Sequence, residues 1–412
     1  MLALIVAVSA IVLPSSAARA DDRADPGSLS SGEPGSGPPV APDDVTTLAR
    51  GTSVKWSDVP RTFWGRRAID HVAGTARWMR DYRALDDGTY PFRPDRSENR
   101  RLLARALVRA FAPDASIDPS IRFDDLSSDS PFYRFANVAV QKGWMRRSRG
   151  RFAPKGPVSP RILHHALVFA LGLRREAAGL DAIHTRDGRA FDTPKGFGTL
   201  LIGMRLGLRY NHSDESLDVG PDTHLSRAEV AWSLYQATTV QDWEIQSMAP
   251  YADIRLPNMR RSKFRFVQWG IDFVGYPYVW GGEWSRRSPA GYPFGSQPIG
   301  GFDCSGMVWW TMKAAGDGWD NRPPRPYGGW ALPQRVSADM ATVGHVYYKD
   351  LAVGDLMFYD GDGDGRVDHV DTSVGNGWSL DSGSSNAGVT ITFTGPGSWY
   401  DEHFVHGRTI MG

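Results

Sequence analysis

Apolar residues along the chain follow two different spacings. Between residues 56 and 237 they recur every three or four positions, as at Leu103, Leu107 and Phe111, which places them on one face of a helix. From about residue 260 onward, short alternating segments rich in aromatic residues and bounded by glycines predict strands. We therefore expect a mostly α-helical N-terminal part followed by an α+β domain.

The helical part repeats itself three times. Each unit leads through a turn into a helix, with Ser97, Ser159 or Ser226 at the expected N-cap position. A serine at this position accepts hydrogen bonds from the first amides of the helix, and Ser226 and Glu229 have the spacing of a capping box. We interpret residues 56–245 as three copies of one small helical unit.

The first 55 residues precede the helical pattern. An apolar run from Leu2 to Leu13, followed by small residues up to Ala20, predicts a signal peptide over residues 1–20. Residues 21–55 contain mainly Gly, Pro, Ser and Asp and predict a flexible linker. No other apolar run approaches the about 20 residues that a membrane span needs. We therefore expect a secreted protein whose mature form has no transmembrane span.

Composition narrows the class of protein. The chain is 41% hydrophobic and contains 15 Trp, enough apolar side chains for the cores of two or more domains. Its formal net charge of +1 gives no support to nucleic-acid binding. Cys304 is the single cysteine of the sequence, so no internal disulfide can form. In an exported protein an unpaired cysteine suggests a reactive thiol, and a buried structural cysteine is the alternative.

The sequence around Cys304 predicts a catalytic nucleophile. The stretch FDCSGMVWWTMKAAG predicts a helix that begins at Cys304 and ends at Gly316. The positive end of the helix dipole favours the thiolate, which is the reactive form. A cysteine nucleophile also needs a base, and we choose His369 because it lies in a predicted strand, residues 367–374.

Strand parity identifies a residue that could orient His369. We expect a three-residue hairpin loop at residues 375–377. That loop gives three facing pairs: Val374 with Trp378, Thr372 with Leu380, and Asp371 with Asp381. Asp381 then shares a face with His369, whereas a two-residue loop at residues 376–377 would turn Asp381 to the other face. The predicted catalytic residues are therefore Cys304, His369 and Asp381.

These segments resemble a known family. The motifs YPYVWGG, FDCSG, VGDLMFYD and DHVDTSVGNG are similar in content and order to the NlpC-type family of papain-like cell-wall cysteine peptidases. The resemblance covers residues 258–412 and implies a papain-like α+β fold, in which a helix bearing the cysteine packs on an antiparallel sheet. The family's third polar position falls on Asp381. The resemblance also implies that Tyr278, Asp303 and Ser305 line the site and contribute to substrate binding and the oxyanion hole.

The resemblance also implies an activity. It indicates hydrolysis of peptidoglycan stem peptides, commonly at the bond from the γ-carboxyl group of D-glutamate to the diamino acid, without a required cofactor. Cys304 would attack the carbonyl carbon, His369 would protonate the leaving amine, and water would release the acyl-enzyme. A non-catalytic wall-binding protein and an amidase or acyl transferase using the same thiol are the alternatives. An insert between Glu283 and Gly301 departs from the family pattern and leaves the bond specificity open.

The three helical units resemble S-layer homology repeats. The match rests on LSRAE at residues 225–229, whereas the corresponding stretches RSENR and VSPRI depart from the pattern. The resemblance implies that the repeats bind an anionic secondary cell-wall polymer, which would place the secreted protein at the cell wall. A basic run at residues 146–151 could contact such a polymer, and a merely solvated face is the alternative.

An acidic segment between two predicted strands suggests a metal site. The stretch DGDGDGRVDHVD, residues 360–371, has the spacing of an EF-hand-type calcium loop. The expected ligands are Asp360, Asp362, Asp364, Asp368 and Asp371. A structural calcium ion would brace the hairpin that presents His369, so chelation would lower activity. The alternative is an acidic hairpin turn that needs no ion.

Overall fold

The structure is a computed structural model that describes residues 54–218, 220–283, 300–314, 332 and 334–411. The predicted signal peptide, nearly all of the predicted linker, most of the insert after Glu283 and the predicted helix end at Gly316 lie outside the described residues. Among the helices of the described ranges, none combines the length and the apolar character that crossing a membrane requires.

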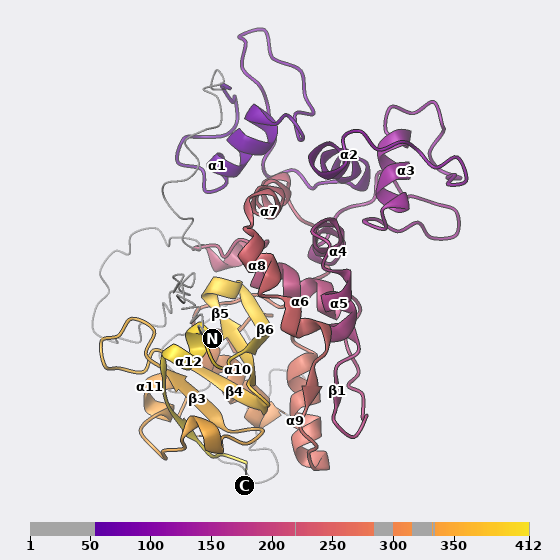
Figure 1. The fold of residues 1–412 in the computed structure, drawn as a ribbon. Coiled ribbons are helices and arrows are strands. Elements are labelled where there is room, and N and C mark those ends of the chain that lie inside the picture. The colour runs from indigo at the N-terminus through magenta and orange to yellow at the C-terminus, as the bar shows by residue number, and fades with distance from the viewer. Residues whose placement is uncertain (1–53, 219, 284–299, 315–331, 333, 412) are drawn as a thin grey trace, which may run out of the picture.

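The N-terminal part is helical, as the apolar spacing predicted (Figure 1, indigo to pink). Its helical elements are α1 (Arg66–Ile69), the π-helical turn η1 (Asp70–Thr75), α2 (Arg100–Phe111), α3 (Tyr133–Gln141), α4 (Pro160–Ala170), α5 (Arg174–Asp181), α6 (Phe197–Arg205), η2 (Glu215–Leu217), α7 (Arg227–Thr239), α8 (Asp242–Gln246) and η3 (Ala249–Ala252). Two short strands, β1 (His184–Thr185) and β2 (Arg255–Leu256), pair in parallel beside them.

The three units expected from the sequence are joined by a ring of backbone hydrogen bonds. The residues just before α2, α4 and α7 meet in space, and each segment donates to the next. The amide of Glu98 donates to the carbonyl of Leu225 (3.0 Å), that of Leu225 to Val158 (2.8 Å), and that of Val158 to Glu98 (3.1 Å). The three units therefore share one closed junction and are not independent modules.

Two of the predicted helix caps differ in the structure. The first helix begins after Asn99, whose Oδ1 accepts the amide of Leu102 at 3.2 Å, and not after Ser97. Ser159 precedes the second helix but makes no side-chain cap. Ser226 does cap the third helix, because its hydroxyl accepts the Glu229 amide at 3.2 Å. The capping box is incomplete since the Glu229 carboxylate binds His212 Nε2 instead.

The arginine of the LSRAE stretch is an internal residue. Arg227 is fully buried, and its Nη1 lies 2.8 Å from both Asp81 Oδ2 and Glu98 Oε2. Its Nε donates to the carbonyl of Phe92 at 2.9 Å. These partners belong to the first unit, so Arg227 ties the third unit to the first. Arg227 is thus a structural link and offers no exposed charge to a ligand.

The C-terminal part is an α+β domain (Figure 1, orange to yellow). Its antiparallel sheet has the strand order β6-β5-β4-β3-β7. Its elements are α9 (Arg261–Ile271), α10 (Cys304–Ala314), α11 (Ser337–Met340), η5 (Tyr348–Asp350), β3 (Leu356–Tyr359), β4 (His369–Gly375), β5 (Trp378–Gly383), η6 (Ser384–Asn386), β6 (Gly388–Phe393), α12 (Trp399–Glu402) and β7 (Phe404–Arg408). Both α9 and α10 pack on the sheet, against β5 and against β4 and β5 respectively.

The β4–β5 hairpin has the predicted register but not the predicted loop. Thr372 pairs with Leu380 as expected, whereas Gly375 and not Val374 pairs with Trp378. The turn has two residues, Asn376 and Gly377, both with positive φ (57° and 76°), which suits the tight turn of a hairpin. An irregularity between Ser373 and Gly375 adds one residue to β4 and restores the register.

The two faces of the sheet carry different side chains. Val370, Val374, Trp378 and Leu380 join the main hydrophobic core, as the sequence predicted. The other face holds a smaller cluster of Met357, Tyr359, Trp399 and Tyr400. His369 and Asp371 lie on this second face, because they pair with Tyr359 and Met357. Asp381 joins them there and accepts the Tyr400 hydroxyl.

Candidate active site

Cys304 is the first residue of α10 and is 2% exposed. The preceding residue, Asp303, caps this helix: its Oδ1 accepts the amide of Gly306, and its carbonyl accepts the amide of Met307 at 3.0 Å. A carboxylate at the N-cap satisfies amides that have no partner within the helix. The thiol therefore lies at a well-capped helix N-terminus, where the helix dipole favours negative charge.

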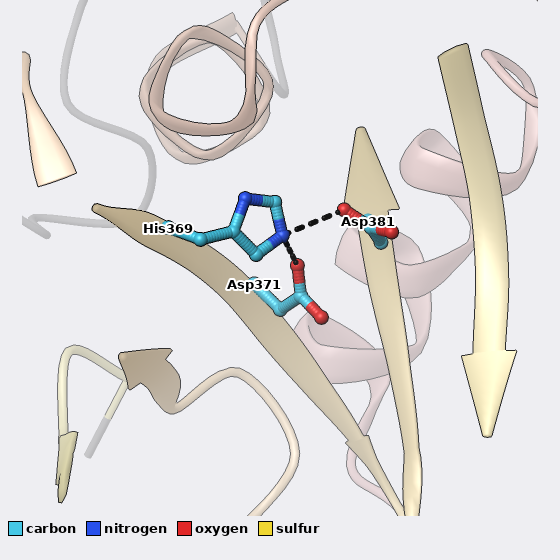
Figure 2. Close-up of side chains that lie close together, drawn as sticks. All are labelled: His369, Asp371 and Asp381. Atoms are coloured by element: carbon cyan, nitrogen blue, oxygen red, sulfur yellow. Dashed lines mark hydrogen bonds and ion pairs between the residues drawn. The ribbon is translucent and has the colours of Figure 1, made fainter. Parts of the chain in front are cut away.

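The imidazole of His369 is held by two carboxylates. His369 begins β4, is 6% exposed, and directs Nε2 toward Asp381 Oδ1 at 3.0 Å and Asp371 Oδ1 at 2.9 Å. Figure 2 shows the other ring nitrogen, Nδ1, pointing away from both carboxylates. This arrangement fixes the ring through Nε2 and turns Nδ1 to the opposite side.

The hydrogen-bond partners of Asp381 favour its ionised form. Its Oδ2 accepts the side-chain amide of Asn386 at 3.1 Å and the hydroxyl of Tyr400 at 2.9 Å, while Oδ1 faces His369. Burial raises the pKa of this carboxyl, but the charge and hydrogen bond of His369 outweigh burial and lower it. Asp381 is 1% exposed, so His369 faces a buried, fully hydrogen-bonded carboxylate.

Asp371 is a second carboxylate at the site that the sequence reasoning assigned to calcium instead. Its Oδ2 accepts the hydroxyl of Ser379 at 2.7 Å, and its side chain is fully buried. Burial, and then the negative charge of Asp381, raise the pKa of Asp371 to about 7. The same strand parity that nominated Asp381 also places Asp371 beside His369, because residues two apart in a strand share a face. That pattern could have identified it.

The acidic loop gathers only part of the expected calcium ligands. Asp360, Asp362 and Asp368 have carboxylate oxygens within 4.8 Å of one another. Asp364 does not join this group, and its Oδ1 accepts the Arg366 amide at 2.9 Å. Asp371 lies in the strand with His369, so the expected ligand at position 12 of the loop is wrong.

The carboxylates of this loop also bind its own backbone. Asp360 accepts the amides of Gly363 at 2.8 Å and Gly365 at 2.9 Å, and Asp368 accepts the amide of Gly361 at 3.0 Å. Such bonds stabilise a tight acidic turn without an ion, although the three neighbouring carboxylates would also suit a hard cation.

Asp303 and Ser305 do not line an open surface. Both are buried and contact the guanidinium of Arg335, whose Nη1 lies 3.0 Å from Asp303 Oδ1 and 2.8 Å from Ser305 Oγ. The Nε of Arg335 pairs with Glu283 Oε2 at 2.9 Å, and Nη2 donates to the carbonyl of Gly282 at 3.0 Å. Asp303 and Ser305 thus help to hold the first turn of α10 in place. Arg335, which binds both of them, is a site residue that was not predicted from the sequence.

The backbone of Tyr278 lies next to the segment that leads into Cys304. It forms a parallel bridge with Phe302, two residues before Cys304, and its amide donates to the carbonyl of Ala387 at 3.2 Å. Tyr278 is 4% exposed. The structure therefore brings the YPYVWGG and FDCSG motifs side by side, next to the turn that carries Asn386.

Comparison with known proteins finds relatives of the C-terminal part of the sequence. Residues 275–408 match the model of the NlpC/P60 family. The chain is 30% identical over 139 residues to the bifunctional muramidase/DL-endopeptidase CwlT of Bacillus subtilis (strain 168), covering 34% of each protein. It is 33% identical over 138 residues to the murein DD-endopeptidase MepH of Escherichia coli (strain K12), covering 34% of this chain and 42% of the relative.

A third relative is the gamma-D-glutamyl-L-lysine dipeptidyl-peptidase of Bacillus subtilis (strain 168), 32% identical over 127 residues, which are 30% of this chain and 33% of that protein. The matched region therefore spans about a third to two fifths of the length of these relatives. The match covers the sheet together with the segments that carry Cys304, His369 and Asp381. Residues 275–408 are thus identified as an NlpC/P60 domain.

Proposed function

We propose that this protein is a secreted peptidoglycan hydrolase that cleaves stem peptides with Cys304 as its nucleophile. The observation that carries the proposal is the placement of His369, whose Nε2 is held by Asp381 while Nδ1 remains on the side away from the carboxylates (Figure 2). A base oriented in this way is what a thiol nucleophile requires. The relatives are named as a muramidase/DL-endopeptidase, a murein DD-endopeptidase and a gamma-D-glutamyl-L-lysine dipeptidyl-peptidase, which supports a peptidoglycan peptide as the substrate.

The mechanism follows from these residue types. Nδ1 of His369 takes the thiol proton of Cys304, and the resulting thiolate attacks the carbonyl carbon of the peptide bond. The backbone N–H of Cys304, at the positive end of α10, and the Tyr278 hydroxyl stabilise the oxyanion. The imidazolium then protonates the leaving amine. The neutral ring finally activates the water that hydrolyses the thioester.

Asp381 serves this cycle by fixing the ring. A carboxylate that accepts from Nε2–H keeps the proton of the neutral ring on Nε2, so Nδ1 is the basic atom. Asp381 also stabilises the imidazolium formed during the reaction. Its other oxygen is held by Asn386 and Tyr400, which keeps the carboxylate from turning away.

For the bond that is cut, we propose the link between D-glutamate and the diamino acid of the stem peptide. Two of the three relatives carry DL-endopeptidase or gamma-D-glutamyl activity in their names, and one is named a DD-endopeptidase. Cleavage at the cross-bridge is therefore the competing outcome.

We also propose that the helical repeats hold the enzyme at the wall by binding an anionic polymer. Arg146, Arg147, Arg149 and Arg151 are exposed on one short segment of the first two units. Arg227 is excluded from this role because it is buried in an ion pair. Replacing the four exposed arginines with glutamine should reduce sedimentation with purified walls while leaving hydrolysis of a soluble peptide unchanged.

Digestion of purified peptidoglycan tests the activity. Full-length protein without the signal peptide is compared with Cys304→Ala, His369→Gln and the control His345→Gln, which alters an exposed histidine of the same domain. Mass spectrometry of the soluble fragments should show new D-glutamate termini with the wild type and the control only. New D-alanine termini would instead identify a DD-endopeptidase.

Two further outcomes would support the alternatives. A new amide or ester on the acyl product would indicate an acyl transferase that uses the same thiol. Folded, wall-bound protein that releases no fragments would indicate a non-catalytic wall-binding protein.

A further inference from the structure

One side chain of the helical part, Arg205, reaches the surroundings of the catalytic centre. Arg205 is the last residue of α6, which packs against β6 of the sheet (Figure 1). Its Nη1 donates to Oδ1 of Asn386 at 2.9 Å, a contact between residues 181 positions apart in the sequence. Asn386 in turn donates to Asp381, which holds His369.

The direction of each bond in this series is set by chemistry. A guanidinium can only donate hydrogen bonds, so it selects the oxygen end of the Asn386 side chain. The NH₂ end of that amide is then the one that faces Asp381 Oδ2, at 3.1 Å. The ionised carboxylate of Asp381 can only accept, so it favours the same orientation of the amide. Arg205 therefore adds a second constraint, and without it the Asn386 side chain would be held at its NH₂ end alone.

Two tyrosine hydroxyls complete the surroundings of Arg205. The hydroxyls of Tyr251 and Tyr400 interact electrostatically with the guanidinium, and Tyr400 also donates to Asp381 Oδ2 at 2.9 Å. Burial lowers the pKa of Arg205, but Tyr251, Tyr400 and Asp381 together raise it, so the side chain stays charged. Both groups that bind Asp381 Oδ2 are thus in contact with Arg205.

The turn that carries Asn386 is itself fixed by the backbone. Asn386 ends η6 and is 4% exposed, and the next residue, Ala387, has a positive φ of 52°. The carbonyl of Ala387 accepts the amide of Tyr278, and the amide of Val389 donates to the carbonyl of Tyr276 at 3.0 Å. With the backbone held in this way, rotation of the side-chain amide of Asn386 is the main motion still open to this residue.

We propose that Arg205 is a positioning residue of the catalytic centre, through which the helical part holds Asn386 and Asp381 in the orientation that His369 requires. This inference rests on the proposed role of Cys304, His369 and Asp381. It makes the helical part a component of the active site as well as a wall anchor. The catalytic domain would then be incomplete without α6.

The test uses full-length protein and three arginine variants. Arg205→Met removes the donors and keeps the apolar stem, whereas Arg205→Lys keeps a cationic donor near Asn386. Arg186→Met is the matched control, because Arg186 Nη2 also donates to an asparagine of the sheet domain, Asn376 Oδ1, at 3.1 Å, but at an exposed position. Thermal unfolding of each variant verifies that it is folded.

Two readouts separate this inference from the proposed function. The first is kcat and KM for peptidoglycan fragments. The second is the rate of alkylation of Cys304 by iodoacetamide, followed by mass spectrometry, which reports the reactivity of the thiol without any substrate. Because Cys304 is the single cysteine of the chain, the modified residue is unambiguous.

We expect Arg205→Met to lower kcat and the alkylation rate by roughly tenfold, in the range found for residues that orient a catalytic ligand, with KM within about twofold. Arg205→Lys should recover most of both rates, and Arg186→Met should match the wild type. An alkylation rate for Arg205→Met equal to that of the wild type would overturn the inference. Wild-type protein with an Arg205-dependent alkylation rate but no hydrolysis would overturn the proposed activity and leave the positioning role standing.

Asn386→Ala provides a second route to the same answer. If Arg205 acts through Asn386, Asn386→Ala alone should slow alkylation, and adding Arg205→Met should cause little further loss. Losses that multiply in the double variant, with both single variants folded, would show that Arg205 does not act through Asn386 and would overturn the proposal. If Arg205→Met is poorly folded, Arg205→Lys takes its place in the double variant.

Discussion

Nε2 of His369 lies 2.9 Å from Oδ1 of Asp371, two residues further along the same strand. Asp381 approaches the same nitrogen from the neighbouring strand at 3.0 Å (Figure 2). Ionising both buried carboxylates beside one imidazole nitrogen costs free energy, because like charges in a low-dielectric site repel. Asp381 has the better donors, so the pair is best described as an ionised Asp381 and an Asp371 that is protonated below about pH 7.

This division of charge predicts unequal effects of two conservative substitutions. Asp381→Asn should lower kcat by roughly 10²- to 10⁴-fold, because the amide no longer holds the ring with Nδ1 as the basic atom. Asp371→Asn should retain kcat within about threefold, because an amide resembles the protonated acid already present. Steady-state kinetics at pH 6 compares them. The reverse order of losses would assign the orienting role to Asp371.

Stability should depend on Asp371 in a specific direction. Its pKa rises from 3.8 to about 7 on folding, so its favourable contribution is complete below pH 3.8 and is lost as the pH rises through 7. Asp371→Asn removes this dependence. Thermal unfolding should therefore show the variant more stable relative to the wild type at pH 8 than at pH 5. An equal difference at both pH values would contradict the raised pKa.

Arg335 is expected to be essential for the start of α10. Removing it leaves Glu283 and Asp303 as buried carboxylates without their cation, which typically costs about 3–5 kcal/mol. Arg335→Met should lower the free energy of unfolding by that order and reduce activity. Arg335→Lys should not restore activity, because a single ammonium cannot serve both carboxylates and Ser305 together.

A control for Arg335 exists in the same domain. Arg408 is also buried, and its Nη1 donates to the neutral acceptors Met340 O at 2.9 Å and Gln334 Oε1 at 3.3 Å. Within the described part of the chain no carboxylate pairs with Arg408, so Arg408→Met should lower the free energy of unfolding less than Arg335→Met does in denaturant unfolding. Equal losses would mean that burial of the arginine stem, and not the ion pairs, accounts for the effect.

His164 should make the helical part sensitive to acid. Burial, and then the charge of Arg209, lower its pKa to about 3, so it is neutral when folded and protonated in the unfolded chain below pH 6.5. Its stabilising contribution is complete above pH 6.5 and is lost as the pH falls, by about 1.4 kcal/mol per unit. His164→Gln should flatten the dependence of unfolding temperature on pH between 6.5 and 4. The exposed His224→Gln should leave that dependence unchanged.

Chelation tests the acidic loop. Because Asp360 and Asp368 already bind loop amides and Asp371 lies elsewhere, we expect EGTA to leave hydrolysis within about twofold of the untreated rate. Loss of activity that calcium restores would support a structural ion at Asp360, Asp362 and Asp368. Asp362→Asn should then reproduce the loss.

Local sequence patterns predicted the helices, strands and catalytic residues of the site better than the residues that support them. The register of Asp381 with β4 was correct because a bulge near Val374 adds the same one-residue shift as the expected three-residue loop. The Asn376-Gly377 pair is a strong signal for a two-residue turn, but no pattern in the neighbouring sequence predicts the compensating bulge. Asp371 was misassigned because an acidic spacing pattern competed with strand parity.

The supporting residues could not be predicted from local patterns. Arg335 is 52 positions from Glu283, and Arg205 is 181 from Asn386. Their contacts arise only when separate elements pack together, so no spacing in the sequence indicates them. The same holds for Arg227 of the LSRAE stretch, whose carboxylate partners lie in the first unit.

The ring formed by Glu98, Val158 and Leu225 limits how this architecture can change. In an open solenoid, each repeat contacts only its neighbours, so repeats can be added or deleted at an end. Here every unit donates to one neighbour and accepts from the other, and the series has no end. Deleting or duplicating one unit would break two of the three bonds. This closed arrangement should therefore resist the gain or loss of a unit, whereas loops away from the junction can change without touching these bonds.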